Sequence, residues 1–182
     1  MSTRSYDVLF IDFYGTLAAG DSEAIDAACQ SAIDDLGLDL SVRDLAQRWG
    51  GALFSMLESS NGAQFDTLYW LQKRALEAAA RSVGVEADCA RYIDDLKAYC
   101  RNPPLHDDAL DALARAGVPV CIVSNADDEE IDAALAAHGV QVDGVITSES
   151  TRSYKPDSTI FTEAMARMGV APERCLHVGG GD

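Results

Sequence analysis

Residues 7–17 read DVLFIDFYGTL, and this stretch decides the fold class. The run from Asp7 to Ile11 is mostly apolar and too short for a helix, which is typical of a strand buried on both faces of a parallel sheet. It ends abruptly in Asp12. Because open parallel sheets bind ligands outside the carboxyl ends of their strands, Asp12 stands where such a sheet carries its chemistry.

The sequence changes character after this strand. From Ser22 to about Arg101, Ala, Leu and Ile recur three and four residues apart among acidic residues, as in EAIDAACQSAIDDLG. That spacing is typical of amphipathic helices. We expect Gly37 to end the first of four helices and Ser41 to cap the second. Because no strand pattern interrupts the block, the sequence predicts an all-helical insertion at residues 21–101.

Helix and strand patterns alternate after the Asn-Pro-Pro at 102–104. The expected strands are VPVCIVSN, GVITS and RCLHVG, and Pro156 is expected in the first turn of a helix that runs to Met168. This alternation predicts an α/β fold with a Rossmann-like parallel sheet, built from residues 1–20 and 102–182. The last strand is followed at once by the final residues, so we also expect a chain truncated at its C-terminus.

Composition narrows the choice of partners. The 182 residues include 30 Asp and Glu against 14 Lys and Arg, a net charge of −16. Such a chain repels phosphate backbones and anionic membranes, so neither nucleic acid nor a membrane is an expected partner. The five cysteines form no CxxC pair, which favours buried thiols in a reducing compartment. With no apolar signal core, a cytoplasmic protein is expected; a homodimer is left open.

Polar side chains stand at the ends of the expected strands or just beyond them. Asp12 follows the first, Ser124 and Asn125 end the second, and Lys155 lies in a later loop. Singly, each has an ordinary explanation as a loop cap, a helix cap or a solvated lysine. Together they predict a site in which Asp12 is a covalent nucleophile, Lys155 holds it ionised and Ser124 binds the transferring group.

The turn after Asp12 supplies further candidates. Backbone N–H groups around Phe13 and Tyr14 are expected to bind the substrate, with Asn125 beside them, and Thr16 is expected to brace the turn. The substrate this site favours is a small anion, since Lys155 offsets negative charge.

Four motifs carry a family resemblance: DFYGTL, IVSN, SYKPDSTIF and LHVGG, in this order, resemble those of the haloacid dehalogenase (HAD) superfamily over nearly the whole chain. The resemblance implies a hydrolase with Asp12 as nucleophile and Ser124 and Lys155 as binding residues. It also implies that residues 21–101 are a C1-type cap that closes over the site. In dehalogenases an arginine near the second cap helix holds the substrate carboxylate or halide, which makes Arg48 a candidate.

Tyr14 bears on the leaving group. Phosphatases of the superfamily usually carry a second Asp at this position as general acid, whereas Tyr is common in the 2-haloacid dehalogenase branch. A halide leaves without a proton and an alkoxide does not. Tyr14 therefore predicts a leaving group that needs no protonation, with a haloacid as the best guess and no cofactor.

Two alternatives on the same fold remain. Glycines 179–181 stand where dehalogenases carry Ser and Asn, and His177-Val178-Gly179 is closer to the phosphatase form. A Mg²⁺-dependent phosphohydrolase would use Asp12, the backbone of Tyr14 and Asp182 as metal ligands. The other alternative is an inactive HAD-fold binding protein. A phospho-receiver domain also uses Asp, Ser or Thr and Lys, but it lacks a helical insertion after the first strand and is disfavoured.

Overall fold

The computed structural model describes residues 5–179. Its parallel sheet has the strand order β3-β2-β1-β4. The strands are β1 (Val8–Ile11), β2 (Val120–Ser124), β3 (Gly144–Thr147) and β4 (Cys175–Val178). The strand that leads to Asp12 is central, since Phe10 pairs with Cys121 on one side and with His177 on the other. The Rossmann-like α/β fold predicted from the sequence is confirmed.

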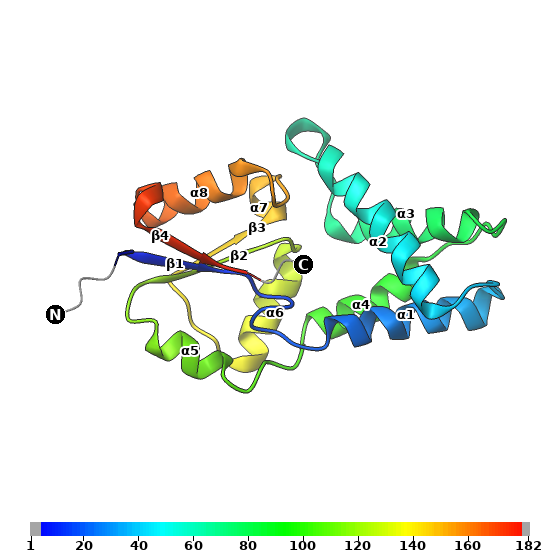
Figure 1. The fold of residues 1–182 in the computed structure, drawn as a ribbon, viewed down its shortest axis with the longest axis horizontal. Coiled ribbons are helices and arrows are strands. Elements are labelled where there is room, and N and C mark those ends of the chain that lie inside the picture. The colour runs from blue at the N-terminus through cyan, green and yellow to red at the C-terminus, as the bar shows by residue number, and fades with distance from the viewer. Residues whose placement is uncertain (1–4, 180–182) are drawn as a thin grey trace.

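Helices cover both faces of the sheet (Figure 1). On one face lie α5 (Ala109–Arg115) and α6 (Asp128–His138); on the other lie α7 (Ser148–Thr151) and α8 (Ser158–Met168). Successive strand residues supply the two apolar cores: Ile11 and Ile122 belong to the core with α6, and Phe10 and Val123 to the core with α8. Burial on both faces explains why β1 and β2 are continuously apolar.

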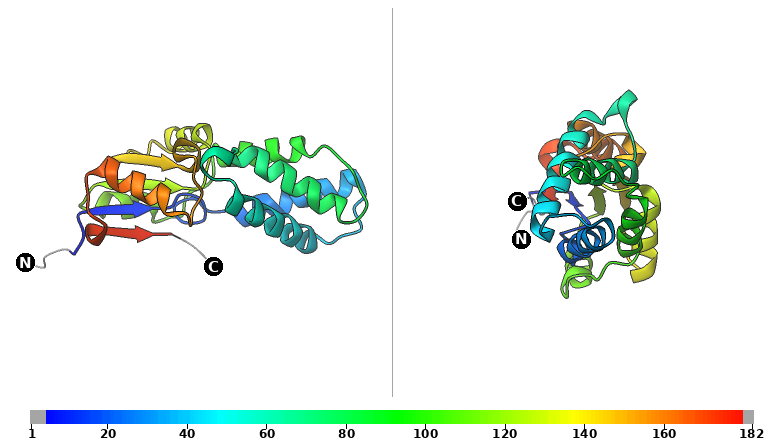
Figure 2. Two further views of the ribbon diagram at one scale, coloured as in Figure 1. Left: turned by 90° about the horizontal axis from the view of Figure 1, so that it is seen from above. Right: turned by 90° about the vertical axis from the view of Figure 1, so that its right-hand side faces the viewer.

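A block of four helices separates β1 from the rest of the sheet in sequence. It consists of α1 (Asp21–Leu36), α2 (Val42–Ser59), α3 (Leu68–Arg81) and α4 (Ala90–Cys100), with a short 3-10 turn, η1 (Gly62–Gln64). The block has an apolar core of its own around Leu45, Leu76 and Ile93, and no strand interrupts residues 21–101, all of which the structure describes. Figure 2 shows that the strands point toward this block, which lies beyond their carboxyl ends.

Local signals set the helix ends in this block as expected. Gly37 takes the left-handed conformation, φ 63°, at the end of α1, and the Ser41 hydroxyl accepts the Asp44 N–H at the start of α2.

The start of α8 differs from the sequence prediction. Pro156 was expected in its first turn, but the helix begins at Ser158. The reason is the carboxylate of Asp157, which accepts the Thr159 N–H at 2.8 Å and so satisfies a donor that the helix leaves unpaired. A second 3-10 turn, η2 (Pro172–Arg174), leads into β4.

The chain passes between sheet and helical block twice, and the two connections lie side by side. The Ala19 N–H donates to the Pro104 carbonyl at 2.8 Å, and the His106 N–H donates to the Leu17 carbonyl at 2.9 Å. These bonds hold the two connections together in one narrow junction. Other contacts between the helical block and the sheet, such as those of Asp127 and Tyr154, also orient the block. Within residues 5–179, no helix has the length and apolar character needed to cross a bilayer.

Candidate active site

The carboxylate of Asp12 is held by three donors directly after β1. Lys155 Nζ lies 2.7 Å from Oδ2, the Ser124 hydroxyl donates to Oδ1 at 2.8 Å, and the Phe13 N–H donates to Oδ1 at 2.8 Å. The Asp12 and Lys155 side chains are only 15% and 16% exposed. Charge-assisted bonds of this kind offset the cost of a partly buried carboxylate. The structure thus brings together three residues that the sequence placed at strand ends or in a loop beyond them.

Parallel pairing places Ser124 beside Asp12. Ile11 of β1 pairs with Ile122 of β2, so the two strands end next to each other and Ser124 is buried against the carboxylate. The backbone N–H of Phe13 was expected to bind substrate. In the structure this N–H is taken by Asp12 itself, while the Phe13 ring is fully buried in the core.

Lys155 is fixed at both ends of the residue. Its ammonium also donates to the Val123 carbonyl at 3.0 Å. Its backbone N–H donates to Asn125 Oδ1 at 2.7 Å, and its carbonyl accepts Asn125 Nδ2 at 3.2 Å. The Asn125 amide, expected to bind substrate, therefore holds the backbone of the residue that faces Asp12.

Tyr14 points toward the helical block. Its hydroxyl donates to the Cys100 carbonyl at the end of α4, at 2.9 Å. Burial is the main reason why the pKa of Tyr14 lies well above its usual range, with smaller contributions from Cys100 and Glu130. The phenol therefore stays protonated and is a poor proton donor to a leaving group.

The turn after Asp12 is tight. The N–H groups of Thr16, Leu17 and Ala18 all donate to the Phe13 carbonyl. Gly15 has φ 72°, a conformation that favours glycine. Thr16 takes part in this turn through its backbone, and the bracing role expected of it stays a prediction.

Arg48 is not brought to Asp12 by the contacts that the structure shows. Its guanidinium is exposed and donates to the Ser82 hydroxyl at 3.0 Å, so it joins α2 to the end of α3 within the helical block. The substrate contact expected of it gains no support from this position, because a helix arginine directed at a neighbouring helix does not reach the sheet.

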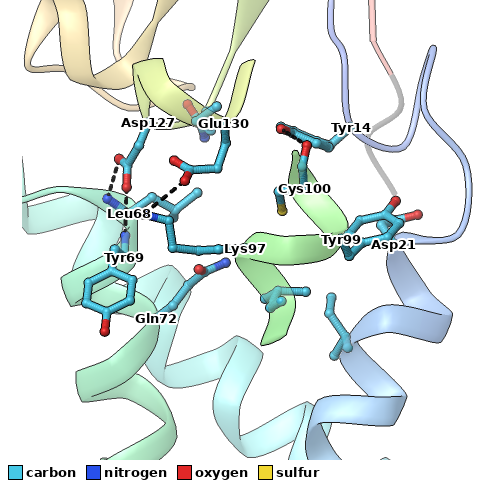
Figure 3. Close-up of a pocket in the computed structure, with 14 residues that line it drawn as sticks. Tyr14, Asp21, Leu68, Tyr69, Gln72, Lys97, Tyr99, Cys100, Asp127 and Glu130 are labelled. Carbon is cyan, nitrogen blue, oxygen red and sulfur yellow. Dashed lines mark hydrogen bonds and ion pairs between the residues drawn. The ribbon is translucent and has the colours of Figure 1, made fainter. Parts of the chain in front are cut away.

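A pocket of about 190 Å³ lies between the helical block and the sheet (Figure 3). Its lining residues from the sheet side are Tyr14, Asn125, Ala126, Asp127 and Glu130, and from the block Asp21, Ile25, Leu68, Tyr69, Gln72, Leu96, Lys97, Tyr99 and Cys100. Asp12 does not line it, but Tyr14 lies two residues after Asp12 and Asn125 follows Ser124. The pocket therefore meets the chain close to Asp12 in sequence, and the block forms one of its walls.

Sequence reasoning missed the ionic groups of this pocket. Lys97 Nζ lies 2.9 Å from Glu130 Oε1 and 5.1 Å from the centre of the Tyr69 ring. Asp127 accepts the N–H groups of Leu68 and Tyr69 at 2.8 and 3.0 Å, at the start of α3 (Figure 3). Burial raises the pKa of Asp127. In sequence these residues are indistinguishable from solvated helix charges, because their partners lie on distant elements.

The metal ligands of the phosphohydrolase alternative are not assembled by the described residues. Asp182 lies outside them, and within residues 5–179 no group of three or more His, Cys, Asp or Glu side chains is placed to hold a metal ion. Both oxygens of Asp12 already accept bonds from Lys155, Ser124 and Phe13. The described residues supply a carboxylate held by an ammonium, and the remaining side-chain ligand expected for a metal, Asp182, lies outside them.

Comparison with known proteins decides the family. The family described as haloacid dehalogenase-like hydrolase matches residues 6–182. The chain belongs to this family of hydrolases.

The chain is also similar to relatives that carry the name (S)-2-haloacid dehalogenase. The chain is 29% identical over 174 residues to (S)-2-haloacid dehalogenase 4A of Burkholderia cepacia and 26% identical over 175 residues to the (S)-2-haloacid dehalogenase of Pseudomonas sp. (strain YL). Each alignment covers 92% of this chain and 71% of the relative. A crystal structure of a dehalogenase with an intermediate complex superposes with a TM-score of 0.74 at 26% identity, covering 99% of this chain and 79% of that one.

Proposed function

We propose that this hydrolase is an (S)-2-haloacid dehalogenase in which Asp12 is the covalent nucleophile. An oxygen of Asp12 attacks carbon 2 of the haloacid, the carbon–halogen bond breaks, and the halide leaves with the bonding electron pair. Water then hydrolyses the ester, which releases a 2-hydroxy acid and restores Asp12. The observation that carries the proposal is the Asp12 carboxylate held by Lys155 at 2.7 Å and Ser124 at 2.8 Å at the carboxyl edge of the sheet.

The charges of the site suit an anionic substrate. An isolated carboxylate repels the carboxylate of a haloacid, but the ammonium of Lys155 cancels its charge at close range. Tyr14 suits a halide, because its protonated hydroxyl is bound to Cys100 and no proton is needed by this leaving group.

We further propose that residues 21–101 act as a cap on a core formed by residues 1–20 and 102–182. The pocket between them receives the substrate beside Asp12. Its apolar wall includes Leu68 and Leu96, which suits the carbon chain of a small acid and excludes water from the reacting atoms.

The second candidate is a Mg²⁺-dependent phosphohydrolase. The observation that favours it is the sequence His177-Val178-Gly179, which is closer to the phosphatase form of the fourth motif. Lys155 and Ser124 also fit a phosphoryl group. The two candidates differ in leaving group and in their need for a metal.

One panel of assays separates them. Wild type and Asp12→Asn are incubated with (S)- and (R)-2-chloropropionate, acetyl phosphate and a simple alkyl phosphate, each with Mg²⁺ and with EDTA. We expect chloride release from the (S) enantiomer in EDTA, none from Asp12→Asn, and an ester on the Asp12 peptide by mass spectrometry after a rapid quench. Preference for the alkyl phosphate and dependence on Mg²⁺ would move the assignment to the phosphohydrolase.

A further inference from the structure

Segment 60–67, between α2 and α3, touches the loop that carries Lys155. We call this segment the docking segment and residues 152–157 the lysine loop. The Gly62 N–H donates to the Arg152 carbonyl at 2.8 Å, and Arg152 Nε donates back to the Gly62 carbonyl at 3.1 Å. Arg152 has φ 53°, which is uncommon for a residue with a side chain. The docking segment thus forms hydrogen bonds with the lysine loop at the residue whose backbone has this uncommon conformation.

Tyr154 makes the central contacts. Its backbone N–H donates to Asn61 Oδ1 at 2.8 Å, and its hydroxyl donates to the Asp66 carbonyl at 2.8 Å. Its ring stacks on Phe65 with 5.2 Å between ring centres, and the side chain is 1% exposed. Burial raises the pKa of Tyr154, so the hydroxyl remains a donor.

Lys155 therefore sits between two restraints. Its own backbone is held by Asn125 at the end of β2, and the preceding residue is held by Asn61 of the helical block. The Lys155 side chain must extend from this point to meet Asp12 at 2.7 Å. A shift of the docking segment would therefore move the Tyr154 backbone, and with it the backbone from which the Lys155 side chain extends.

We propose that Asn61 and Tyr154 are positioning residues that couple docking of the helical block to the placement of Lys155 against Asp12. The site is complete only while the docking segment is seated on the lysine loop. An undocked block loosens the contact between Lys155 and Asp12, so the nucleophile of an open enzyme is less well prepared to react. The coupling rests on the proposed function only in that the proposed function makes Asp12 the nucleophile. The placement of Lys155 can be tested without any reaction.

Asn61 offers a matched pair of variants. Its Nδ2 donates to the Leu57 and Glu58 carbonyls, both at 3.3 Å, at the end of α2, while its Oδ1 serves Tyr154. Asn61→Asp keeps an acceptor for Tyr154 but turns an oxygen toward the two α2 carbonyls, which costs stability at the end of α2; Asn61→Ala loses the bonds on both sides. Tyr154→Phe removes the bond to Asp66 and keeps the ring.

The first readout needs no substrate. Lysine occurs at positions 73, 97 and 155 of the sequence, and the side chains of Lys73 and Lys155 are both 16% exposed and ion-paired. Labelling with an amine-reactive reagent, followed by mass spectrometry, gives the ratio of Lys155 to Lys73 modification. We expect Asn61→Ala to raise this ratio about five-fold, the effect of one lost hydrogen bond, and Asn61→Asp to leave it near the wild-type value.

The second readout is the single-turnover rate of ester formation on Asp12 at saturating (S)-2-chloropropionate. We expect Asn61→Ala to lower this rate about five-fold with little change in KM, and Asn61→Asp to restore it. A purely structural role would change the amount of folded enzyme and leave the rate per folded molecule unchanged.

Each outcome decides the coupling. An unchanged labelling ratio in folded Asn61→Ala, or equal rises in Asn61→Ala and Asn61→Asp, overturns it, because the bond to Tyr154 would then have no effect on Lys155. If Asn61→Ala does not fold, Tyr154→Phe replaces it; the same rise is expected, and an unchanged ratio in this variant overturns the coupling as well. Absence of any haloacid turnover by wild type sinks the proposed function but leaves the labelling test intact.

Discussion

Lys155 Nζ and Ser124 Oγ approach different oxygens of Asp12, at 2.7 and 2.8 Å. Oδ1 also accepts the Phe13 N–H, whereas Oδ2 faces Lys155, so Oδ2 is the oxygen that keeps a lone pair for an incoming carbon atom. This arrangement also fixes the plane of the carboxylate, so that attack does not require a search through side-chain rotamers. The ammonium also offsets the negative charge of Asp12, so an anionic substrate meets less repulsion when it approaches the carboxylate.

Removal of this ammonium should abolish most of the activity. We expect Lys155→Met to lower kcat/KM for (S)-2-chloropropionate by about 10²–10³-fold, the scale for loss of a preorganised electrostatic group. Lys155→Arg should retain part of the activity, because it keeps the charge but replaces the compact ammonium by a larger, planar guanidinium. Circular dichroism serves as the control for folding. Near-wild-type rates in folded Lys155→Met would show that Asp12 does not depend on its partner.

Tyr14 should be dispensable for the chemical step. Tyr14→Phe loses the bond to the Cys100 carbonyl, so we expect a stability loss of about 1 kcal/mol and halide release within ten-fold of wild type. Tyr14→Asp should not raise haloacid activity, but we expect it to add weak Mg²⁺-dependent hydrolysis of alkyl phosphates, because it supplies a general acid. Halide assays and denaturant titrations on the same preparations test both. A folded Tyr14→Phe without halide release would assign the hydroxyl a role in the reaction.

What the sequence predicted correctly depends on local patterns and on one topological rule. Short apolar runs mark buried strands, and parallel strands end at the same edge. That rule was enough to bring Asp12 and Ser124 together, whereas Lys155, in a loop beyond the third strand, was added by the order of the four family motifs. Helix ends such as Gly37 and Ser41 follow from the residue itself, because a left-handed φ and a side-chain acceptor are local properties.

What the sequence did not reveal lies between the helical block and the sheet. Asp127 reads as the first of several acids at the start of α6, yet its carboxylate binds the N–H groups at the start of α3. The start of α6 is served instead by Glu149, which accepts the Asp128 N–H at 2.7 Å. Arg48 was a candidate because dehalogenases carry an arginine near the second cap helix, but a place in a helix does not tell which neighbour a surface arginine meets. Such pairings join distant elements and have no local signature.

The ion pair between Lys97 and Glu130 should stabilise the contact between α4 and α6. Glu130 is 7% exposed, and its other cationic neighbour, Arg101, lies at 3.5 Å. Lys97→Met leaves the carboxylate poorly compensated in a buried position, so we expect a loss of about 2 kcal/mol in the free energy of unfolding. The double variant Lys97→Met with Glu130→Leu should recover most of it, since no charge is then left buried. Urea denaturation of both single variants and the double variant completes the cycle; additive losses would indicate that the pair is not coupled.

His177 should make stability depend on pH. It lies on β4 as an exposed side chain, with its ring 5.2 Å from that of Phe161. Partial desolvation, followed by the charge of Lys155, lowers the pKa of His177 below its ordinary value of 6.5. Between the lowered pKa and 6.5 the unfolded chain binds a proton that the folded chain does not, so the contribution of His177 is fully present above pH 6.5 and is lost as the pH falls through the folded pKa. Denaturation at several pH values should therefore show that acidification lowers the free energy of unfolding less in His177→Gln than in wild type.

An NMR titration of the His177 imidazole gives its pKa directly. Lys155→Met should raise this pKa, because the repelling charge is gone while Asp12 remains. A pKa above 6.5 in wild type would contradict the described surroundings of this side chain.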